Sequence, residues 1–249
     1  ELPLIPPELR EDIGELDAKP GLDFGLIELA DIRAELHAHT TASDGAMNIV
    51  ELAQQAKKRG FHTIAVTDHS KSSPIAGGLT PERLLEHIEA VHEARKKVKD
   101  ITILAGSEVD ILADGSLDYD DDLLAKLDIV VASPHASLKQ SEKDATKRLL
   151  RAVQHPAVRI LGHPSGRLIN RREGLTIDIR AIAEAAAAHD VALEINANWL
   201  RLDLRDVHVR AALAAGALIA IDCDVHSPAD FDQLRFGVLT GRRGGLTPE

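Results

Sequence analysis

The strongest constraint on the fold is a regular alternation of strand-like and helix-like patterns along most of the chain. Seven short apolar segments are predicted to be strands: residues 33–36, 63–67, 102–105, 129–133, 158–161, 192–195 and 218–221. Amphipathic segments lie between them. Strands that alternate with helices form parallel sheets, and seven repeats within 249 residues favour a single α/β barrel over an open sheet.

The predicted helices have recognisable ends. Asn48 is placed to cap a helix, Glu51 stands where a capping-box acid would stand, and Gly60 ends the segment. Thr80 and Pro81 have the residue types of an N-cap and a first helical position. Apolar residues at helical spacing predict three further helices, around residues 149–153, 179–186 and 211–215.

The two ends of the chain have features of connecting segments. Residues 2–7 are rich in proline, which is typical of a semi-rigid linker, and the chain starts with Glu1. The last six residues repeat the hexamer at 77–82, which precedes a predicted helix. We therefore expect a piece of a longer polypeptide, in which residues 1–30 form a linker after an upstream module and residues 31–249 form the folded domain.

Composition excludes several classes of protein. The one cysteine, Cys223, cannot form an internal disulfide, and the longest apolar run, 211–221, is shorter than the roughly 18 residues of a membrane span. No secretory signal is visible, so we expect a cytoplasmic protein. The net charge of −11 argues against a surface that attracts polyanions throughout. A phosphate-bearing substrate is still compatible with this charge, because bound divalent cations can make one site positive.

Half of the histidines fall at one structural position. Of the twelve, six lie at or just after the C-terminal ends of predicted strands: His37, His39, His69, His135, His163 and His226. In an α/β barrel these ends meet at one rim, where active sites are built. One histidine is more often a packing residue than a ligand, but six that reach the same rim predict a metal site.

Carboxylates follow the same pattern. His37 and His39 are two residues apart on an extended segment and point to the same side, as do Asp224 and His226. The full set of candidate ligands, which we also expect to be the catalytic residues, is His37, His39, Asp44, His69, Glu108, His135, His163, Asp224 and His226. Nine ligands exceed the need of one ion, so two or three divalent ions are expected, and imidazole with carboxylate suits Mn, Zn and Fe. Alternation turns Cys223 away from them.

This ligand set favours metal-assisted phosphoester hydrolysis. Clustered divalent ions lower the pKa of bound water toward 7 and stabilise a departing alkoxide, so no nucleophilic side chain is needed. The sequence contains neither a G-x-S-x-G elbow nor a P-loop, which leaves acyl-enzyme and nucleoside-triphosphatase schemes without support. A metal-dependent amidohydrolase also begins with H-x-H, but Asp44 and Glu108 fit that pattern poorly.

The motifs taken together resemble those of a known family. They are His37-Ala38-His39-Thr40, Ser43-Asp44-Gly45, Thr67-Asp68-His69, Gly106-Ser107-Glu108, Ser133-Pro134-His135, Gly162-His163-Pro164 and Asp222-Cys223-Asp224-Val225-His226. In this order they are similar to the polymerase and histidinol phosphatase (PHP) domain. The resemblance implies a distorted seven-stranded (β/α) TIM-like barrel with a trinuclear metal centre.

The resemblance also implies a division of the ligands. One metal would be held by His37, His39, Glu108 and Asp224. Glu108 would bridge to a second metal held by His135 and His163. Asp44, His69 and His226 would hold the third.

The flanking segments narrow the resemblance. Residues 5–12, 194–198 and 201–204 are similar to the C-terminal PHP region of bacterial family X DNA polymerases; the Trp199-Leu200 pair departs from that pattern. This likeness implies a manganese-dependent 3′–5′ exonuclease that processes DNA 3′ ends in repair. Its partners would be DNA 3′ ends and an upstream polymerase module in the same polypeptide, with a location near the bacterial nucleoid and no membrane association.

Other polar residues of the rim loops are candidate substrate contacts. These are Arg201, Asn196, Lys71 and Arg167, with Arg201 as the preferred phosphate contact. Trp199 could stack on a terminal base, although a packing role is favoured for it. Asp68 would orient another ligand or form a structural hydrogen bond.

Two alternatives to the exonuclease remain open. The domain could be a phosphatase for small phosphomonoesters of the histidinol phosphate type. It could also be a non-catalytic, metal-bound scaffold, which the loss of several ligands would indicate. All nine candidate ligands are present, which favours catalysis.

Overall fold

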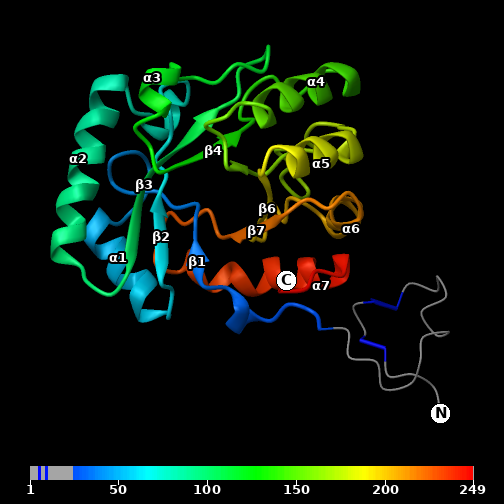
Figure 1. The fold of residues 1–249 in the computed structure, drawn as a ribbon, viewed down its shortest axis with the longest axis horizontal. Coiled ribbons are helices and arrows are strands. Elements are labelled where there is room, and N and C mark those ends of the chain that lie inside the picture. The colour runs from blue at the N-terminus through cyan, green and yellow to red at the C-terminus, as the bar shows by residue number, and fades with distance from the viewer. Residues whose placement is uncertain (1–4, 7–8, 11–24, 249) are drawn as a thin grey trace.

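The strands form one parallel sheet that curls into a barrel (Figure 1). In this computed structural model, residues 5–6, 9–10 and 25–248 are described. The strands are β1 (Ala34–Glu35), β2 (Thr63–Val66), β3 (Thr102–Asp110), β4 (Ile129–Ser133), β5 (Ile160–Leu161), β6 (Ala192–Asn196) and β7 (Ile219–Asp222). Each pairs in parallel with the next along the chain. All seven predicted strands are confirmed, with ends that differ by a few residues.

The seam between β7 and β1 is closed in an unusual way. Beyond the strands, Ala38 and Val225 form an isolated parallel bridge, and His39 N donates to Val225 O at 2.7 Å. Just before Ala38 and Val225 along the chain, side chains take the place of backbone hydrogen bonds between β1 and β7. Leu36 N donates to Asp222 Oδ1 at 2.7 Å, and Cys223 N donates to the Glu35 carboxylate at 3.0 Å. The barrel is therefore nearly closed but distorted, as predicted.

Helices surround the strands (Figure 1). The five that the sequence predicts are α1 (Ile49–Lys58), α2 (Pro81–Lys97), α4 (Glu142–Val153), α5 (Ile179–Ala188) and α6 (Asp206–Ala214). Asn48 and Glu51 form the expected capping box on α1, and Thr80 caps α2 with Pro81 in its first turn. Elements without a sequence prediction are α3 (Asp121–Leu124), α7 (Leu234–Gly244) and the 3₁₀ turns η3 (Leu29–Asp31), η4 (Pro74–Ala76) and η5 (Asp230–Gln233).

The interior of the barrel changes character along its axis. A small apolar cluster of Ala65, Ile129, Val131 and Ile160 fills it, and Ala192 packs against this cluster. Inward residues alternate along a strand. On β6 they therefore run from Ala192 through Glu194 to Asn196, from apolar to polar toward the C-terminal end. This order places a polar layer above a packed floor. Cys223, directly after β7, is fully buried in the large apolar core cluster and not among the ligands, as expected.

The segment before β1 contacts the end of α7. Ile27 N donates to Leu246 O at 2.9 Å, and Arg242 Nη1 donates to Ile27 O at 3.1 Å. Most of the predicted linker over residues 1–30 lies outside the described residues, as does the last residue of the repeated hexamer. Among the described helices, none combines the length and apolar character that crossing a membrane requires.

Glycines let α7 pack closely on the barrel. A Cβ at Gly237 would lie 2.6 Å from Ile221 Cγ2 and 2.8 Å from Ala197 Cβ, and both neighbours are buried. Gly244 makes a similar approach to Val209 of α6. The buried face of α7 is therefore shaped by the absence of side chains, although glycine disfavours an isolated helix by about 1 kcal/mol per residue relative to alanine.

We predict that Gly237→Val destabilises the fold by about 1–3 kcal/mol, because overpacking a tight contact forces neighbours to move. Thermal unfolding followed by circular dichroism measures this change. The control is Leu239→Val on the exposed side of the same helix, where a change within about 0.5 kcal/mol is expected. Equal melting temperatures for the two variants would contradict the close packing.

Candidate metal centre

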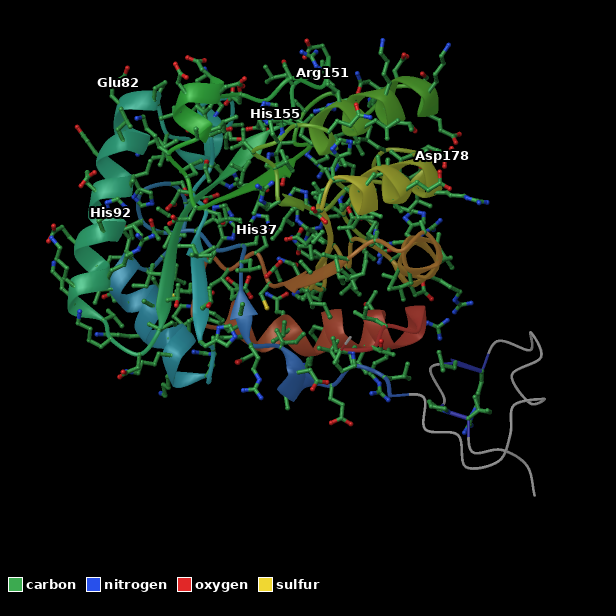
Figure 2. All side chains as sticks on the ribbon, in the orientation of Figure 1. His37, Glu82, His92, Arg151, His155 and Asp178 are labelled. Carbon is green, nitrogen blue, oxygen red and sulfur yellow. The ribbon has the colours of Figure 1, made fainter. Side chains whose placement is uncertain are left out.

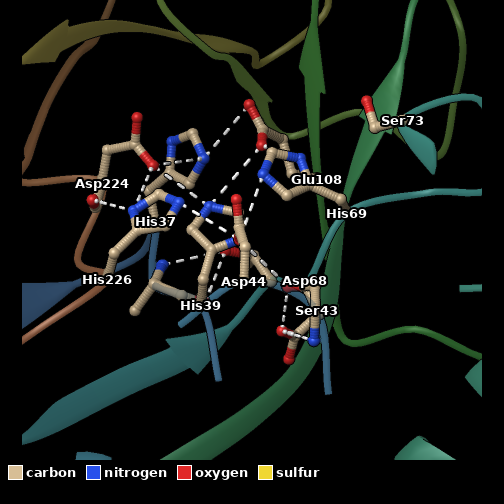
Figure 3. A network of polar contacts seen from close by, with 12 residues as sticks. His37, His39, Ser43, Asp44, Asp68, His69, Ser73, Glu108, Asp224 and His226 are labelled. Carbon is tan, nitrogen blue, oxygen red and sulfur yellow. Dashed lines mark hydrogen bonds and ion pairs between the residues drawn. The ribbon is translucent and has the colours of Figure 1, made fainter. Parts of the chain in front are cut away.

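The six rim histidines meet at the C-terminal end of the barrel. Figure 2 shows His37 near the middle of the molecule, whereas His92 and His155 lie on its outer elements. Figure 3 shows His37, His39, His69 and His226 facing Glu108, Asp44 and Asp224. Side chains from strands far apart in the sequence thus share one small volume.

Glu108, at the C-terminal half of β3, is the centre of this cluster. Its carboxylate is fully buried. Oε1 lies 2.8 Å from His163 Nε2, 3.2 Å from His135 Nε2 and 3.3 Å from His37 Nε2. Oε2 lies 2.9 Å from His69 Nδ1 and 3.6 Å from His39 Nε2. One carboxylate therefore faces imidazoles from β1, β2, β4 and β5.

Asp224 and Asp44 complete the cluster on either side of His39. Asp224 Oδ1 lies 3.1 Å from His39 Nε2 and 3.7 Å from His37 Nε2. Asp44 Oδ1 lies 3.3 Å from His226 Nε2 and 3.5 Å from His69 Nε2. His39 is also stacked between the rings of His69 and His226, at centroid distances of 4.3 and 4.2 Å.

All nine candidate ligands fall into groups with a geometry suited to cations. Within each group the ligand atoms lie within 4.8 Å of one another; the groups are His39-Asp44-His69-His226, His37-Glu108-His163, His37-His39-Asp224 and His69-Glu108-His135. The structure thus brings together the nine side chains that the sequence singles out as candidates. The pairing differs in detail from the division implied by the resemblance, because His37 approaches His163 and His69 approaches His135.

Unpartnered atoms show that these residues fit divalent ions. Buried atoms without a hydrogen-bond partner include His37 Nε2, both ring nitrogens of His39, His69 Nδ1, His163 Nδ1, Glu108 Oε2 and Asp224 Oδ1. Buried polar atoms without partners are costly to the fold. Imidazole nitrogen and carboxylate oxygen are ligands of Mn, Zn and Fe. Cations placed among these atoms would satisfy them.

Without metal, the protonation of the cluster reflects the same need of its buried carboxylates for positive charge. The pKa of Glu108 and that of Asp224 are held well below the usual value by the surrounding imidazoles, although burial opposes this shift. Burial also opposes the charged form of His69, yet Glu108 and Asp44 raise its pKa to about 10. In contrast, burial and the neighbouring His69 lower the pKa of His39 to about 4. Without metal, protons on some imidazoles thus balance the negative charge of the carboxylates, a role that bound cations could take.

A second layer of carboxylates orients the imidazoles. Glu194 Oε1 lies 2.6 Å from His37 Nδ1, and Glu194 Oε2 accepts from the backbone N of His163 at 2.6 Å. Asp110 Oδ1 lies 2.8 Å from His135 Nδ1. Such partners fix the tautomer and direction of a ligating imidazole. Sequence reasoning missed both acids; their inward position, two residues from Asn196 and Glu108 on the same strands, was the available indication.

Asp68 holds the turn that carries Asp44. It accepts from Thr40 N at 2.9 Å, from Thr40 Oγ1 at 2.7 Å and from Ser43 N at 3.1 Å, and Ser43 Oγ also donates to it. His87 Nε2, from α2, lies 2.8 Å from Asp68 Oδ2, the oxygen that also accepts from Thr40 Oγ1. Asp68 therefore acts on a backbone turn and not directly on another ligand. His87 was not predicted, because its helical position is typical of a packing residue.

Two candidate ligands have left-handed backbone conformations. The φ angle of His163 is 24° and that of Asp224 is 54°. For residues other than glycine such conformations cost about 1–3 kcal/mol and occur often at functional sites. Before His163, Gly162 permits the close approach, since a Cβ there would lie 2.4 Å from Ser133 Oγ. The fold thus accepts local strain where it aims the ligands.

The candidate substrate residues have different surroundings. Arg201 Nε lies 3.5 Å from Asp224 Oδ2, and its Nη1 is buried without a hydrogen-bond partner. Asn196 Nδ2 donates to Asp224 Oδ2 at 3.1 Å. Arg167 Nε donates to Arg201 O at 2.7 Å, and Lys71 Nζ lies 5.8 Å from the centre of the Tyr119 ring. Of the four, Arg201 alone combines contact with the cluster and an unused donor.

Trp199, on the loop after β6, is 58% exposed. The packing role favoured for it is therefore wrong. Its backbone N donates to Gln233 Oε1 at 3.0 Å, so the loop is held at the rim while the indole ring stays exposed.

Comparisons with known proteins agree with the site. The family model described as "PHP domain" matches residues 35–198. The chain is 44% identical over 243 residues to "DNA polymerase/3′-5′ exonuclease PolX" of Bacillus subtilis, covering 98% of this chain and 42% of that protein. The chain therefore spans less than half the length of this relative. It is also 33% identical over 202 residues to a "Probable phosphatase" of Proteus mirabilis, covering 77% of this chain and 78% of that protein.

A solved structure has the same fold. The histidinol phosphate phosphatase of Lactococcus lactis subsp. lactis, complexed with zinc, L-histidinol and phosphate, superposes with a TM-score of 0.61. It is 16% identical, and the match covers 86% of this chain and 94% of that one. The family match spans β1 to β6, including most of the rim ligands. The chain belongs to the PHP domain family.

Proposed function

We propose that this chain is a manganese-dependent 3′–5′ exonuclease that acts on DNA 3′ ends. The coarser activity, metal-dependent phosphoester hydrolysis, follows from the PHP family and the ligand cluster. The observation that carries the proposal is the convergence of nine imidazole and carboxylate groups with unpartnered buried atoms. All nine would act as metal ligands and so as catalytic residues.

Divalent ions held by these residues would supply a water of lowered pKa and neutralise charge on the phosphate. The residues of the chain prepare the site for this. Glu194 and Asp110 hold His37 and His135 in fixed directions. Asp68 holds the turn that places Asp44 opposite His69 and His226. Because these contacts are already formed without substrate, little reorganisation is needed when substrate binds.

Arg201 would bind the phosphate. Its guanidinium lies at the edge of the cluster, beside Asp224, and lowers the pKa of His163, a shift for which burial is the main cause. The unused Nη1 is a donor suited to a phosphate oxygen, since arginine recognises phosphates through paired N–H groups. Asn196 would support this contact by orienting Asp224, and Arg167 by bonding the backbone of the Arg201 loop.

The choice of DNA rests on the relative from Bacillus subtilis, whose name includes a DNA polymerase and a 3′-5′ exonuclease, and which matches 98% of this chain. On the same ground we propose that residues 1–30 connect the domain to a polymerase module, and that the protein works in DNA repair in the cytoplasm. The second candidate is a phosphatase for small monoesters. It is favoured by the Proteus mirabilis relative, which this chain covers over 78% of its length.

Incubation with a DNA primer labelled at its 5′ end tests the two candidates. We expect stepwise shortening from the 3′ terminus with Mn²⁺, a weaker reaction with Mg²⁺ or Zn²⁺, and none with excess chelator. The same preparation is assayed with histidinol phosphate. An intact primer together with rapid release of inorganic phosphate from the small ester would replace the exonuclease by the phosphatase.

His39→Ala should reduce primer hydrolysis by more than about 100-fold, because even residues that only orient ligands change activity by about 10–100-fold. The matched control is His92→Ala, which removes a partly exposed imidazole on α2, outside the cluster. This control should retain the parent rate. Far-ultraviolet circular dichroism should be native for both variants, and a fully active His39→Ala enzyme would refute its role as a ligand.

Metal binding should also stabilise the fold. A free ion at 100 times its dissociation constant adds about 2.7 kcal/mol, which for a chain of this size corresponds to a rise in melting temperature of roughly 5–10 °C. Differential scanning calorimetry of chelated protein, with and without added Mn²⁺, measures the shift. Asp224→Ala should show a smaller shift than the His92→Ala control, and the same shift in both would contradict coordination by Asp224.

A further inference from the structure

An apolar pocket opens directly beside the metal centre. Its volume is about 390 Å³, which is within the size range of small-molecule sites. Asp44, His69 and His135 line it on the side of the cluster. Apolar lining comes from Pro74 to Ala76 and from Ile111 to Ala113. A phosphoester bound at the cluster would therefore have one of its substituents facing this pocket.

The loop that forms one wall is firmly anchored. Ser72 donates through its backbone N to Asp118 at 2.7 Å and through its hydroxyl at 2.5 Å. Ser73 Oγ donates to Asp110 Oδ2 at 2.8 Å, and Gly78 N donates to Ser73 O at 3.0 Å. Figure 3 shows Ser73 at the edge of the polar network, near His69. Ser72 and Ser73, at the start of this loop, are thus hydrogen-bonded to neighbouring segments without substrate.

Ile75, at the centre of this loop, is fully exposed, with a relative accessibility of 103%. It is the most exposed of the large apolar side chains in the described part of the chain. A hydrogen-bonded loop that presents an isoleucine to water next to the metal centre has the properties of a binding surface, because covering that side chain is favourable.

The polar groups of the pocket do not select a charged ligand. Asp44 faces His69 and His226, and Asp110 is bonded to His135 and Ser73. Both oxygens of the buried Asp110 are therefore occupied, and Asp44 shares one oxygen between two imidazoles. The remaining lining is mostly apolar. The lining therefore offers mostly apolar contact to a group joined to the phosphate.

We propose that this pocket, with Ile75 as its main contact, receives the nucleobase of the 3′-terminal nucleotide. The assignment rests on the proposed exonuclease function and deepens it. The pocket is lined by residues of the loop at 72–76, of the segment at 110–113 and by Ala136. Because hydrolysis at a 3′ end releases the terminal nucleotide, the base of that nucleotide is the group that would adjoin the phosphate at the cluster. Aliphatic contact with a base face does not depend on base identity, so the terminus would be bound without sequence preference.

Two 5′-labelled, single-stranded oligodeoxynucleotides test the proposal. They differ only at the 3′ end, which carries either thymidine or the abasic tetrahydrofuran analogue. The parent chain with Mn²⁺ should have a kcat/KM roughly tenfold higher for the thymidine end, as expected when a base covers one isoleucine. In Ile75→Ser this ratio should fall to near one, with the loss in KM. The rate at the abasic end, measured with the same variant, is the reference for this ratio.

The matched control is Leu218→Ser. Leu218 is 63% exposed and immediately precedes β7, at the end of the barrel away from the ligands, so the parent ratio should persist. Shortening of both substrates with equal kcat/KM in the parent, or an unchanged ratio in Ile75→Ser, would overturn the base pocket alone. Failure to shorten either oligonucleotide, with turnover of small phosphomonoesters, would overturn the exonuclease and the base pocket together.

Discussion

The structure depends on one buried carboxylate whose negative charge must be compensated. Glu108 is fully buried and faces imidazoles from four other strands, at distances from 2.8 to 3.6 Å. A buried charge of this kind is stable only with opposite charge and hydrogen bonds around it. Protonated imidazoles can provide that charge, and divalent cations can provide it more fully. Metal binding and folding therefore act on the same groups, so the apoprotein and the metal-loaded protein should differ in stability as well as activity.

The barrel brings together the distant side chains that compensate the charge of Glu108. Parallel strands carry their C-terminal ends to one rim, so residues as distant in sequence as His37 and Asp224 come within 3.7 Å. The apolar floor around Val131 keeps the lower interior filled, and the polar layer sits above it. The seam also belongs to this layer, because Glu35 and Asp222 join β1 to β7 through side chains. The barrel is distorted at this seam, where side-chain carboxylates and not backbone carbonyls accept the hydrogen bonds between the two strands.

The sequence predicted what periodicity and residue type determine locally. The seven strands, the capping box at Asn48 and the set of nine rim residues were all available from it. It did not predict α7, because the glycines on its buried face have low helix propensity, and only close packing against Ile221 and Ala197 makes them favourable. Nor did it predict Glu194 or His87 as supports. Their partners are distant in sequence, so the contacts exist only once the barrel has formed.

Asp110 connects the two halves of the proposed active site. One of its oxygens lies 2.8 Å from the His135 ring, and the other accepts from Ser73 at the same distance. The first contact fixes a candidate ligand, and the second fixes the loop that presents Ile75. Since one buried side chain makes both, the wall of the pocket has a set position relative to the metal centre. A phosphate at the cluster and a base against Ile75 would then be held in one fixed geometry. A substrate fixed in this way reacts faster than a mobile one, because the entropy of positioning is lost on binding and not in the reaction step.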